Sequence, residues 1–148
     1  MATRRHRSLY FAYGSNMCRI RLERRIGAVD VVGAAVLTGF RHRFNKLGAD
    51  GTAKGNIVAV GGARVVGVVY AVSEPQLETL DVHEGGYRRL VVSPARAGAL
   101  VEAVAFVAVA PVVELAPPSS EYLEFYRRGL EQHGIDSAYL AELIEELS

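Results

Sequence analysis

Residues 10–17, Tyr-Phe-Ala-Tyr-Gly-Ser-Asn-Met, combine the end of a strand, a glycine turn and the start of a helix. The aromatic and apolar run Ser8–Ala12 predicts a buried strand. Ser15 or Asn16 is expected to cap a helix over residues 17–26. Because the first N–H groups of a helix lack intrahelical partners and lie at the positive end of its dipole, such a turn also suits an anion. Taken alone, the residues favour plain capping.

Runs rich in strand-forming residues occupy most of the chain beyond this helix. Glycine-bearing turns separate them, and Val, Ile and aromatic residues favour strands. The predicted strands are Val31–Phe40, Asn56–Val60, Val65–Val72, Arg88–Ser93 and Leu100–Val109. Residues 48–55 are polar and glycine-rich, which predicts a surface loop near the site. About six strands without regular strand–helix alternation predict an α+β fold, a small mixed β-barrel or curled sheet with flanking helices.

The first two helices show distinct sequence signals. In the first, Cys18, Leu22 and Ile26 recur at four-residue spacing and predict a buried stripe. A second helix is expected to begin at Ser73, which has capping-box spacing to Gln76. Its apolar face and its end are predicted to be Leu77, Leu80 and Gly85-Gly86.

The last third of the chain changes to helical spacing. The stiff turn Pro117–Ser120 ends in cap residues. Apolar side chains recur at helical spacing from Tyr122 onward, and Gly134 is expected to end this helix. Asp136 is expected to cap a final helix, with Ile135 and Leu140 as a hydrophobic staple. The predicted apolar face of this helix is Leu140, Leu143, Ile144 and Leu147.

Composition excludes several functional classes. The chain has 148 residues, of which 50% are hydrophobic, and 17 basic side chains face 16 acidic ones. This length predicts a single domain over residues 1–148, with residues 1–7 as a basic tail. A packed core is expected rather than disorder, and nucleic-acid binding is disfavoured by the near-neutral charge. Because Cys18 is the only cysteine, neither an internal disulfide nor a Cys-rich zinc site is possible, and no metal or cofactor is expected.

The sequence gives no sign of a membrane partner. The apolar stretch 97–115 contains Gly98, Glu102, Pro111 and Glu114, which favours buried strands over a membrane helix. The apolar run after the N-terminal arginines is too short for a signal peptide. A cytoplasmic protein is expected, and its oligomeric state stays open, a homodimer included.

Two separated motifs carry a family resemblance. Phe11–Met17 (FAYGSNM) closely resembles the signature of the γ-glutamylcyclotransferase family. Leu80–Arg88 (LDVHEGGYR) resembles the segment of that family that bears the catalytic glutamate. Further similar segments follow in matching order: Asn56–Val58, Gly67–Tyr70 and Pro117–Tyr122. The resemblance covers roughly residues 8–135 and implies a mixed β-barrel with flanking helices, whose cavity holds a γ-glutamyl group.

The resemblance also implies a reaction. Such enzymes convert a γ-glutamyl amino acid or amine into 5-oxoproline and the free amine, and the substrate's own α-amine attacks its γ-carbonyl. No metal, nucleotide or protein nucleophile is needed. Glu84 is implied as the general base and acid. Since a glutamate with an ordinary pKa of about 4.3 is a weak base at neutral pH, the hypothesis includes a pKa raised by an apolar cavity.

Six further residues are implied in binding the small γ-glutamyl substrate. The residues implied to form its cradle are Tyr13, Gly14, Ser15 and Asn16. Tyr87 and Tyr122 match tyrosines that line the family's cavity, where each hydroxyl would orient Glu84 or the substrate. Packing at the edge of the core is the alternative for both tyrosines. Ser15 is disfavoured as a nucleophile because it lacks the G-x-S-x-G context.

Substrate detail stays open at this stage. Residues 106–110 contain no tyrosine, where some family members carry another substrate-contacting one on the side of the leaving amine. One alternative keeps the chemistry and removes a γ-glutamyl protecting group from a biosynthetic intermediate. Another is a non-catalytic carboxylate-binding module, which Glu84 disfavours. His83 is expected to face solvent, and the remaining histidines show no ligand spacing.

Overall fold

The structure is a computed structural model that describes residues 7–111 and 117–147. Its strands are β1 Arg7–Ala12, β2 Asp30–Leu47, β3 Ala53–Ser73, β4 Tyr87–Val92, β5 Ala95–Arg96, β6 Ala99–Leu100 and β7 Ala103–Ala108. Its helices are the 3-10 helix η1 Ser15–Met17, α1 Arg19–Ile26, α2 Glu74–His83, α3 Ser120–Gln132 and α4 Ala138–Glu145. Most of the predicted basic tail lies outside the described residues.

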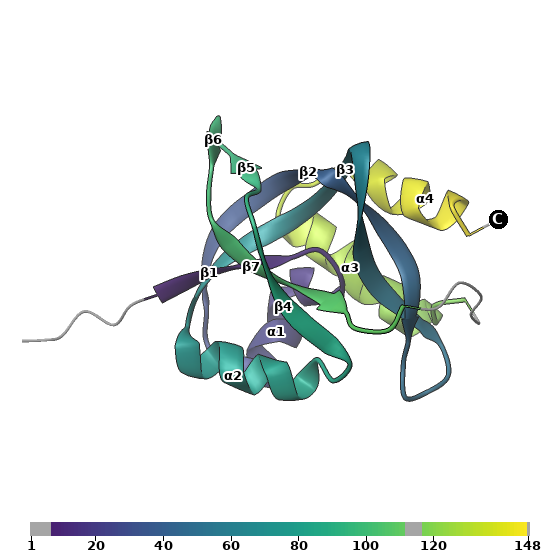
Figure 1. The fold of residues 1–148 in the computed structure, drawn as a ribbon, viewed down its shortest axis with the longest axis horizontal. Coiled ribbons are helices and arrows are strands. Elements are labelled where there is room, and N and C mark those ends of the chain that lie inside the picture. Colours follow the sequence, from purple (N-terminus) through teal and green to yellow (C-terminus); the bar gives the residue numbers. More distant parts are fainter. Residues whose placement is uncertain (1–6, 112–116, 148) are drawn as a thin grey trace, which may run out of the picture.

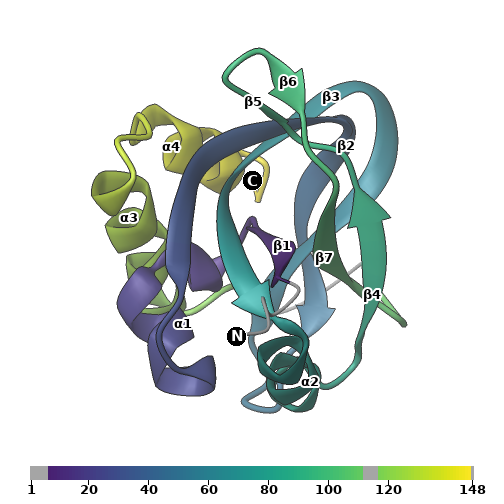
Figure 2. The ribbon, with the colours of Figure 1, turned by 90° about the vertical axis from the view of Figure 1, so that its left-hand side faces the viewer.

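The strands form one seven-stranded sheet in the order β4-β7-β1-β3-β2-β5-β6. The sheet curls into a half-barrel, with α1, α3 and α4 on one side (Figures 1 and 2). The central strand β1 pairs antiparallel with β3 along its whole length and parallel with β7. This arrangement confirms the predicted α+β fold with a curled mixed sheet and flanking helices.

Both faces of β1 are buried, as its apolar sequence predicts. Tyr10 and Ala12 pack in a cluster that includes side chains of all four α-helices. Phe11 and Tyr13 alternate with them and pack with side chains of β2, β3, β4 and β7. The strand is therefore held from both sides, which gives the turn that follows it a rigid base.

The β2–β3 hairpin is longer than the sequence predicts. Asn56–Val60 and Val65–Val72 belong to one strand, because Gly61 and Gly62 continue it instead of turning the chain. The β2–β3 register shifts between Val31 and Gly33, between Thr38 and Phe40 and between Arg43 and Lys46. Such bulges bend and twist long strands, so that the hairpin follows the curl of the sheet. The predicted loop 48–55 shrinks to a tight turn, since β3 already begins at Ala53.

The helix after β1 begins later than predicted. Residues 15–17 form a separate 3-10 turn, and α1 starts after Cys18. Neither Ser15 nor Asn16 caps a helix through its side chain, so that prediction is wrong. Both side chains make contacts with residues elsewhere in the site, as described below. The predicted buried stripe is largely confirmed, with Cys18 and Leu22 buried and Ile26 packed partly against the core.

The capping box of α2 is confirmed. Ser73 Oγ accepts a hydrogen bond from the Gln76 backbone at 3.2 Å, and Gln76 Oε1 accepts one from the Ser73 N–H at 2.9 Å. Gln76 Nε2 also donates to the carbonyls of Ile26 and Ala28, at the end of α1. The start of α2 is thus fixed both locally and against the neighbouring helix.

The C-terminal helices agree only in part with their predictions. Ser119 caps α3 by accepting from the Tyr122 N–H at 3.1 Å. Asp136 accepts from the Ala138 N–H at 2.9 Å, although α4 has Ser137 at its N-cap position. The buried side chains of α4 are Tyr139 and Leu143, whereas the predicted Ile144 and Leu147 are exposed. Tyr139 lies on the buried face instead, where its hydroxyl accepts a hydrogen bond from the Val66 N–H at 3.2 Å.

None of the helices in residues 7–111 and 117–147 has the length and apolar character needed to cross a bilayer. Within the apolar stretch 97–115, residues 99–108 form β6 and β7 around a short connection. Residues 112–116 lie outside the described part of the chain.

Replacing Ser73 by Ala is expected to lower the free energy of unfolding by about 1 kcal/mol, because the Gln76 N–H loses its acceptor. Urea denaturation measures the change. Ser93→Ala is the matched control, because Ser93 is exposed and lies outside any helix cap. Equal stability of the Ser73 variant and the unmodified protein would contradict the capping role.

Candidate active site

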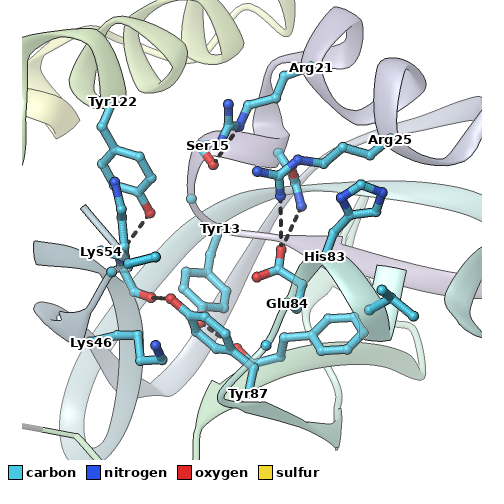
Figure 3. A pocket seen from close by; sticks show the side chains of 18 of the residues that line it. Tyr13, Ser15, Arg21, Arg25, Lys46, Lys54, His83, Glu84, Tyr87 and Tyr122 are labelled. Atoms are coloured by element: carbon cyan, nitrogen blue, oxygen red, sulfur yellow. Dashed lines mark hydrogen bonds and ion pairs between the residues drawn. The ribbon is translucent and has the colours of Figure 1, made fainter. Parts of the chain in front are cut away.

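A cavity of about 330 Å³ lies between the end of β1, helix α1, the β2–β3 turn and the end of α2 (Figure 3). This volume is typical of small-molecule sites. The structure brings all seven predicted site residues to its wall, although they come from distant parts of the chain. They are Tyr13, Gly14, Ser15, Asn16, Glu84, Tyr87 and Tyr122.

Glu84 is held at the cavity by the end of α2. It is the C-cap residue of that helix, and its backbone N–H donates to the Leu80 carbonyl at 2.8 Å. The chain then turns at Gly85 and Gly86 into β4. Gly86 has φ +83°, a left-handed conformation that glycine adopts without strain. The Glu84 side chain is only 16% exposed.

The environment of Glu84 raises the pKa of its carboxyl group. Burial is the largest cause, because it disfavours the charged form. The Arg25 guanidinium, with Nη1 3.6 Å from Glu84 Oε1, opposes the shift. So does the hydrogen bond that Asn16 Nδ2 donates to Oε1 at 2.9 Å. With burial dominant, this carboxyl group releases its proton at a higher pH than an ordinary glutamate does.

Asn16 connects the β1 turn to Glu84. Its Nδ2 donates both to Glu84 Oε1 and to the Tyr10 hydroxyl, at 3.1 Å. Its Oδ1 is buried and has no hydrogen-bond partner among the described residues. A buried acceptor without a partner is costly, so this atom suits a donor on a ligand.

Ser15 and Gly14 complete this turn. Ser15 Oγ accepts a hydrogen bond from Arg21 Nε at 3.0 Å, which ties the turn to α1. A Cβ on Gly14 would lie 3.1 Å from the Tyr126 hydroxyl, so a glycine leaves room for the tight packing of α3.

The predicted tyrosines contact the backbone rather than Glu84. The Tyr87 hydroxyl donates to the Gly55 carbonyl at 2.7 Å, and the Gly55 N–H donates to the Tyr122 hydroxyl at 2.8 Å. The Tyr13 hydroxyl donates to the Phe106 carbonyl. Both hydroxyls bind the Gly55 peptide, and neither forms a hydrogen bond with Glu84 in the described part of the chain. That either tyrosine orients Glu84 or the substrate stays a prediction.

A buried layer supports these tyrosines from behind. His42 Nε2 and the Tyr126 hydroxyl lie 2.7 Å apart, and both residues are almost fully buried. Burial lowers the pKa of His42 to about 3, so its ring is neutral at physiological pH. A Cβ on Gly55 would lie 2.2 Å from the Tyr126 hydroxyl, which explains the glycine in the middle of this layer. The sequence showed His42 only as one of several scattered histidines.

Sequence reasoning missed the cations of the cavity. Four basic side chains line it: Arg21, Arg25, Lys46 and Lys54. The i,i+4 spacing of the two arginines on α1 was an available signal, because it places both on one helix face. The lysines depend on the β2–β3 register, which the sequence alone did not supply. His83 also borders the cavity and is exposed, as predicted.

No group of three or more His, Cys, Asp or Glu side chains suited to a metal ion occurs in the described part of the chain. Cys18 is a free cysteine and is buried, which agrees with a packing role. Phe106 lines the cavity at the start of the segment that lacks a tyrosine, so the wall is apolar there.

A family model and a solved structure both name gamma-glutamyl cyclotransferase. A family model described as "Gamma-glutamyl cyclotransferase, AIG2-like" matches residues 10–125. A solved structure named "Gamma-glutamyl cyclotransferase" is 26% identical with a TM-score of 0.84, over 93% of this chain and 86% of that chain. An uncharacterized protein from Homo sapiens is 28% identical with a TM-score of 0.83, over the same shares of the two chains.

A third solved structure, YkqA from Bacillus subtilis, is 27% identical with a TM-score of 0.81 and is matched over 96% of this chain and 54% of its own. A search of curated proteins gave no match. The family match spans every predicted site residue from Tyr13 to Tyr122. The chain therefore belongs to the gamma-glutamyl cyclotransferase, AIG2-like family.

Proposed function

We propose that the protein is an enzyme that converts a small γ-glutamyl amino acid or amine into 5-oxoproline and the free amine. Its family and its fold support γ-glutamylcyclotransferase-like activity. The observation that carries the proposal is the state of Glu84, a buried carboxyl group with a raised pKa at the wall of the cavity. A group of this kind exchanges protons near neutral pH more effectively than an ordinary glutamate.

The two oxygens of Glu84 have different surroundings. Asn16 and Arg25 both contact Oε1. Among the described residues, no hydrogen bond or ion pair involves Oε2, which points toward the middle of the cavity (Figure 3). One oxygen thus fixes the orientation of the carboxylate, and the other is available for proton transfer with a ligand.

In the proposed reaction, the α-amine nitrogen of the substrate attacks its own γ-carbonyl carbon. Glu84 accepts a proton from this nitrogen as the new C–N bond forms. It then donates the proton to the departing nitrogen as the original amide C–N bond breaks, and returns to its ionised form. Because both reacting groups belong to one molecule, the main task of the protein is to hold the folded-back conformer.

The β1 turn is proposed to hold the γ-glutamyl group. Asn16 Oδ1, the buried acceptor, suits the α-amine and would place it beside Glu84. The N–H groups of the turn, with Ser15 and the nearby Arg21, suit the α-carboxylate. Donors directed at the oxygen of the developing tetrahedral carbon are each worth about 3 kcal/mol in reactions of this kind.

The non-catalytic alternative explains fewer of these features. A module that only binds a carboxylate gains nothing from a second, buried carboxylate in the same cavity, since like charges repel. Removal of a γ-glutamyl protecting group would use the same residues and differs only in the leaving amine.

Replacing Glu84 by Gln is expected to lower kcat at least about a hundredfold, because the amide cannot transfer the proton. Mass spectrometry of 5-oxoproline measures turnover with γ-glutamyl amino acids, γ-glutamyl amines and glutathione. Glu78→Gln is the control, since Glu78 is exposed on the same helix. Unchanged turnover in the Glu84 variant, or no 5-oxoproline from any compound with the unmodified enzyme, would contradict the proposal.

Replacing Arg25 by Gln should shift the acid limb of the kcat/KM profile to higher pH. The Arg25 charge lowers the pKa of Glu84, so its loss lets burial raise that pKa further. At mildly acidic pH a smaller fraction of the base is then ionised, and activity falls. Arg24→Gln controls for the loss of a charge on α1, because Arg24 is exposed. An acid limb that moves to lower pH or stays in place would be inconsistent with this assignment.

The raised pKa of Glu84 also predicts how stability depends on pH. When the folded state has the higher pKa, the carboxyl group favours folding while protonated, and this contribution is lost as pH rises through the folded pKa. Glu84→Gln should therefore have a higher Tm than the unmodified protein at neutral pH. The difference should shrink below the ordinary glutamate pKa, where Glu84 is protonated in both states. Thermal unfolding from about pH 3 to about pH 8 tests this, and a Tm difference independent of pH would count against it.

A further inference from the structure

Both lysines of this chain lie at the cavity. Of the 17 basic side chains, 15 are arginines and only Lys46 and Lys54 are lysines. Both line the cavity, and they are direct partners across the antiparallel β2–β3 pair. Like charges opposite each other on neighbouring strands are destabilising. Their placement therefore suits an anion bound between them.

The surrounding residues hold both ammonium groups in place. Lys46 Nζ donates to the Leu47 carbonyl at 2.7 Å and lies 5.4 Å from the centre of the Tyr87 ring. Lys54 Nζ lies 4.6 Å from the centre of the Tyr122 ring. The same two tyrosines bind the Gly55 peptide through their hydroxyls, so their rings are rigid supports for the lysines.

The charges of the cavity are unevenly distributed. Among its described lining residues, Glu84 is the only acidic one. Arg25 lies beside Glu84, and Arg21 beside Ser15, next to the proposed α-carboxylate site. Lys54 lies on the side of the cavity away from Arg25 (Figure 3), whereas Lys46 packs against Gly86 and its charge helps to lower the pKa of Glu84. The ion pair of Glu84 is with Arg25 and not with either lysine, so both ammonium groups can bind the part of the substrate that lies beyond the γ-glutamyl group.

Asp50 neutralises one lysine in part. Its Oδ2 lies 3.1 Å from Lys54 Nζ, at the exposed tip of the hairpin. Lys46 has no carboxylate partner among the described residues. An anion in the cavity would contact Lys46 directly and would compete with Asp50 for Lys54.

We propose that Lys46 and Lys54 bind a carboxylate on the leaving group, and so select γ-glutamyl compounds whose released amine is anionic over those whose released amine is not. The inference rests on the proposed function and assigns the leaving-group end of the same cavity. It makes the two lysines specificity-determining residues, while Glu84 carries the proton transfer.

Two substrates that differ only in the leaving group test this directly. γ-Glutamyl-alanine carries the carboxylate, and γ-glutamyl-alaninamide replaces it by a neutral amide. We expect the unmodified enzyme to prefer the acid by at least about tenfold in kcat/KM, as charge-assisted hydrogen bonds in a partly buried site allow. The preference should appear mainly in KM, because the carboxylate takes no part in the bonds that form and break and is bound in the ground state and the transition state alike. It should weaken with added salt.

Variants locate the preference within the site. In the double variant Lys46→Met and Lys54→Met, the ratio of kcat/KM for acid over amide should fall toward one. Arg43→Met is the matched control, because Arg43 is an exposed cation on the same strand that does not line the cavity, and its ratio should stay unchanged. Asp50→Asn should increase the ratio, because it frees Lys54. This variant keeps the Oδ1 acceptor that binds Thr52, so the turn is preserved.

Lysine labelling gives a readout that does not depend on turnover. In Glu84→Gln, γ-glutamyl-alanine should slow reductive methylation of Lys46 and Lys54 more than γ-glutamyl-alaninamide does, as measured by peptide mass spectrometry. Equal protection by the two compounds, or equal kcat/KM for both with the unmodified enzyme, would overturn the inference and leave the proposed function standing. Absence of 5-oxoproline from every γ-glutamyl compound would overturn both.

Discussion

The hydrogen bond from Asn16 to Glu84 joins the two halves of the site, and the rest of the cavity is arranged around it. Asn16 belongs to the turn after the central strand β1, and Glu84 ends α2. The strand is paired on both sides, and α2 is tied to α1 through Gln76. The carboxylate is therefore positioned by elements that are each fixed to their neighbours by hydrogen bonds. Such support keeps a reacting group within the small displacement that catalysis tolerates.

The site concentrates unfavourable electrostatics in one place. Burial opposes the charge of Glu84, Asn16 Oδ1 has no donor within residues 7–111 and 117–147, and Lys46 faces Lys54 across the hairpin. Each of these features lowers the stability of the folded protein. A ligand with an amine near Asn16 and anionic groups elsewhere would relieve them together. Local destabilisation of this kind is common where a binding site is built at the expense of stability.

The sequence predicted those parts of the fold that depend on local signals. Strand β1 followed from its apolar run, and the start of α2 from the spacing of Ser73 and Gln76. The helix after β1 begins later than predicted. The Asn16 side chain does not cap this helix, because it binds a carboxylate 68 positions away. The β2–β3 bulges, and with them the position of Lys46, depend on pairing across the sheet. The candidate site residues were predicted from the resemblance of two sequence motifs to those of a known family. Periodicity and composition do not contain that information.

The hairpin register constrains how the length of this region can vary. The tip of the hairpin around Asp50 and Gly51 is exposed, and exposed loop tips ordinarily accept insertions and deletions. Closer to the sheet, a shift of one residue turns every side chain of a strand to the opposite face. A single inserted residue between Lys54 and Gly55 would turn Lys54 out of the cavity or pull the Gly55 peptide away from Tyr87 and Tyr122. Variation in length among related chains should therefore be confined to the tip, because Ala53 and Gly55 beside it are buried.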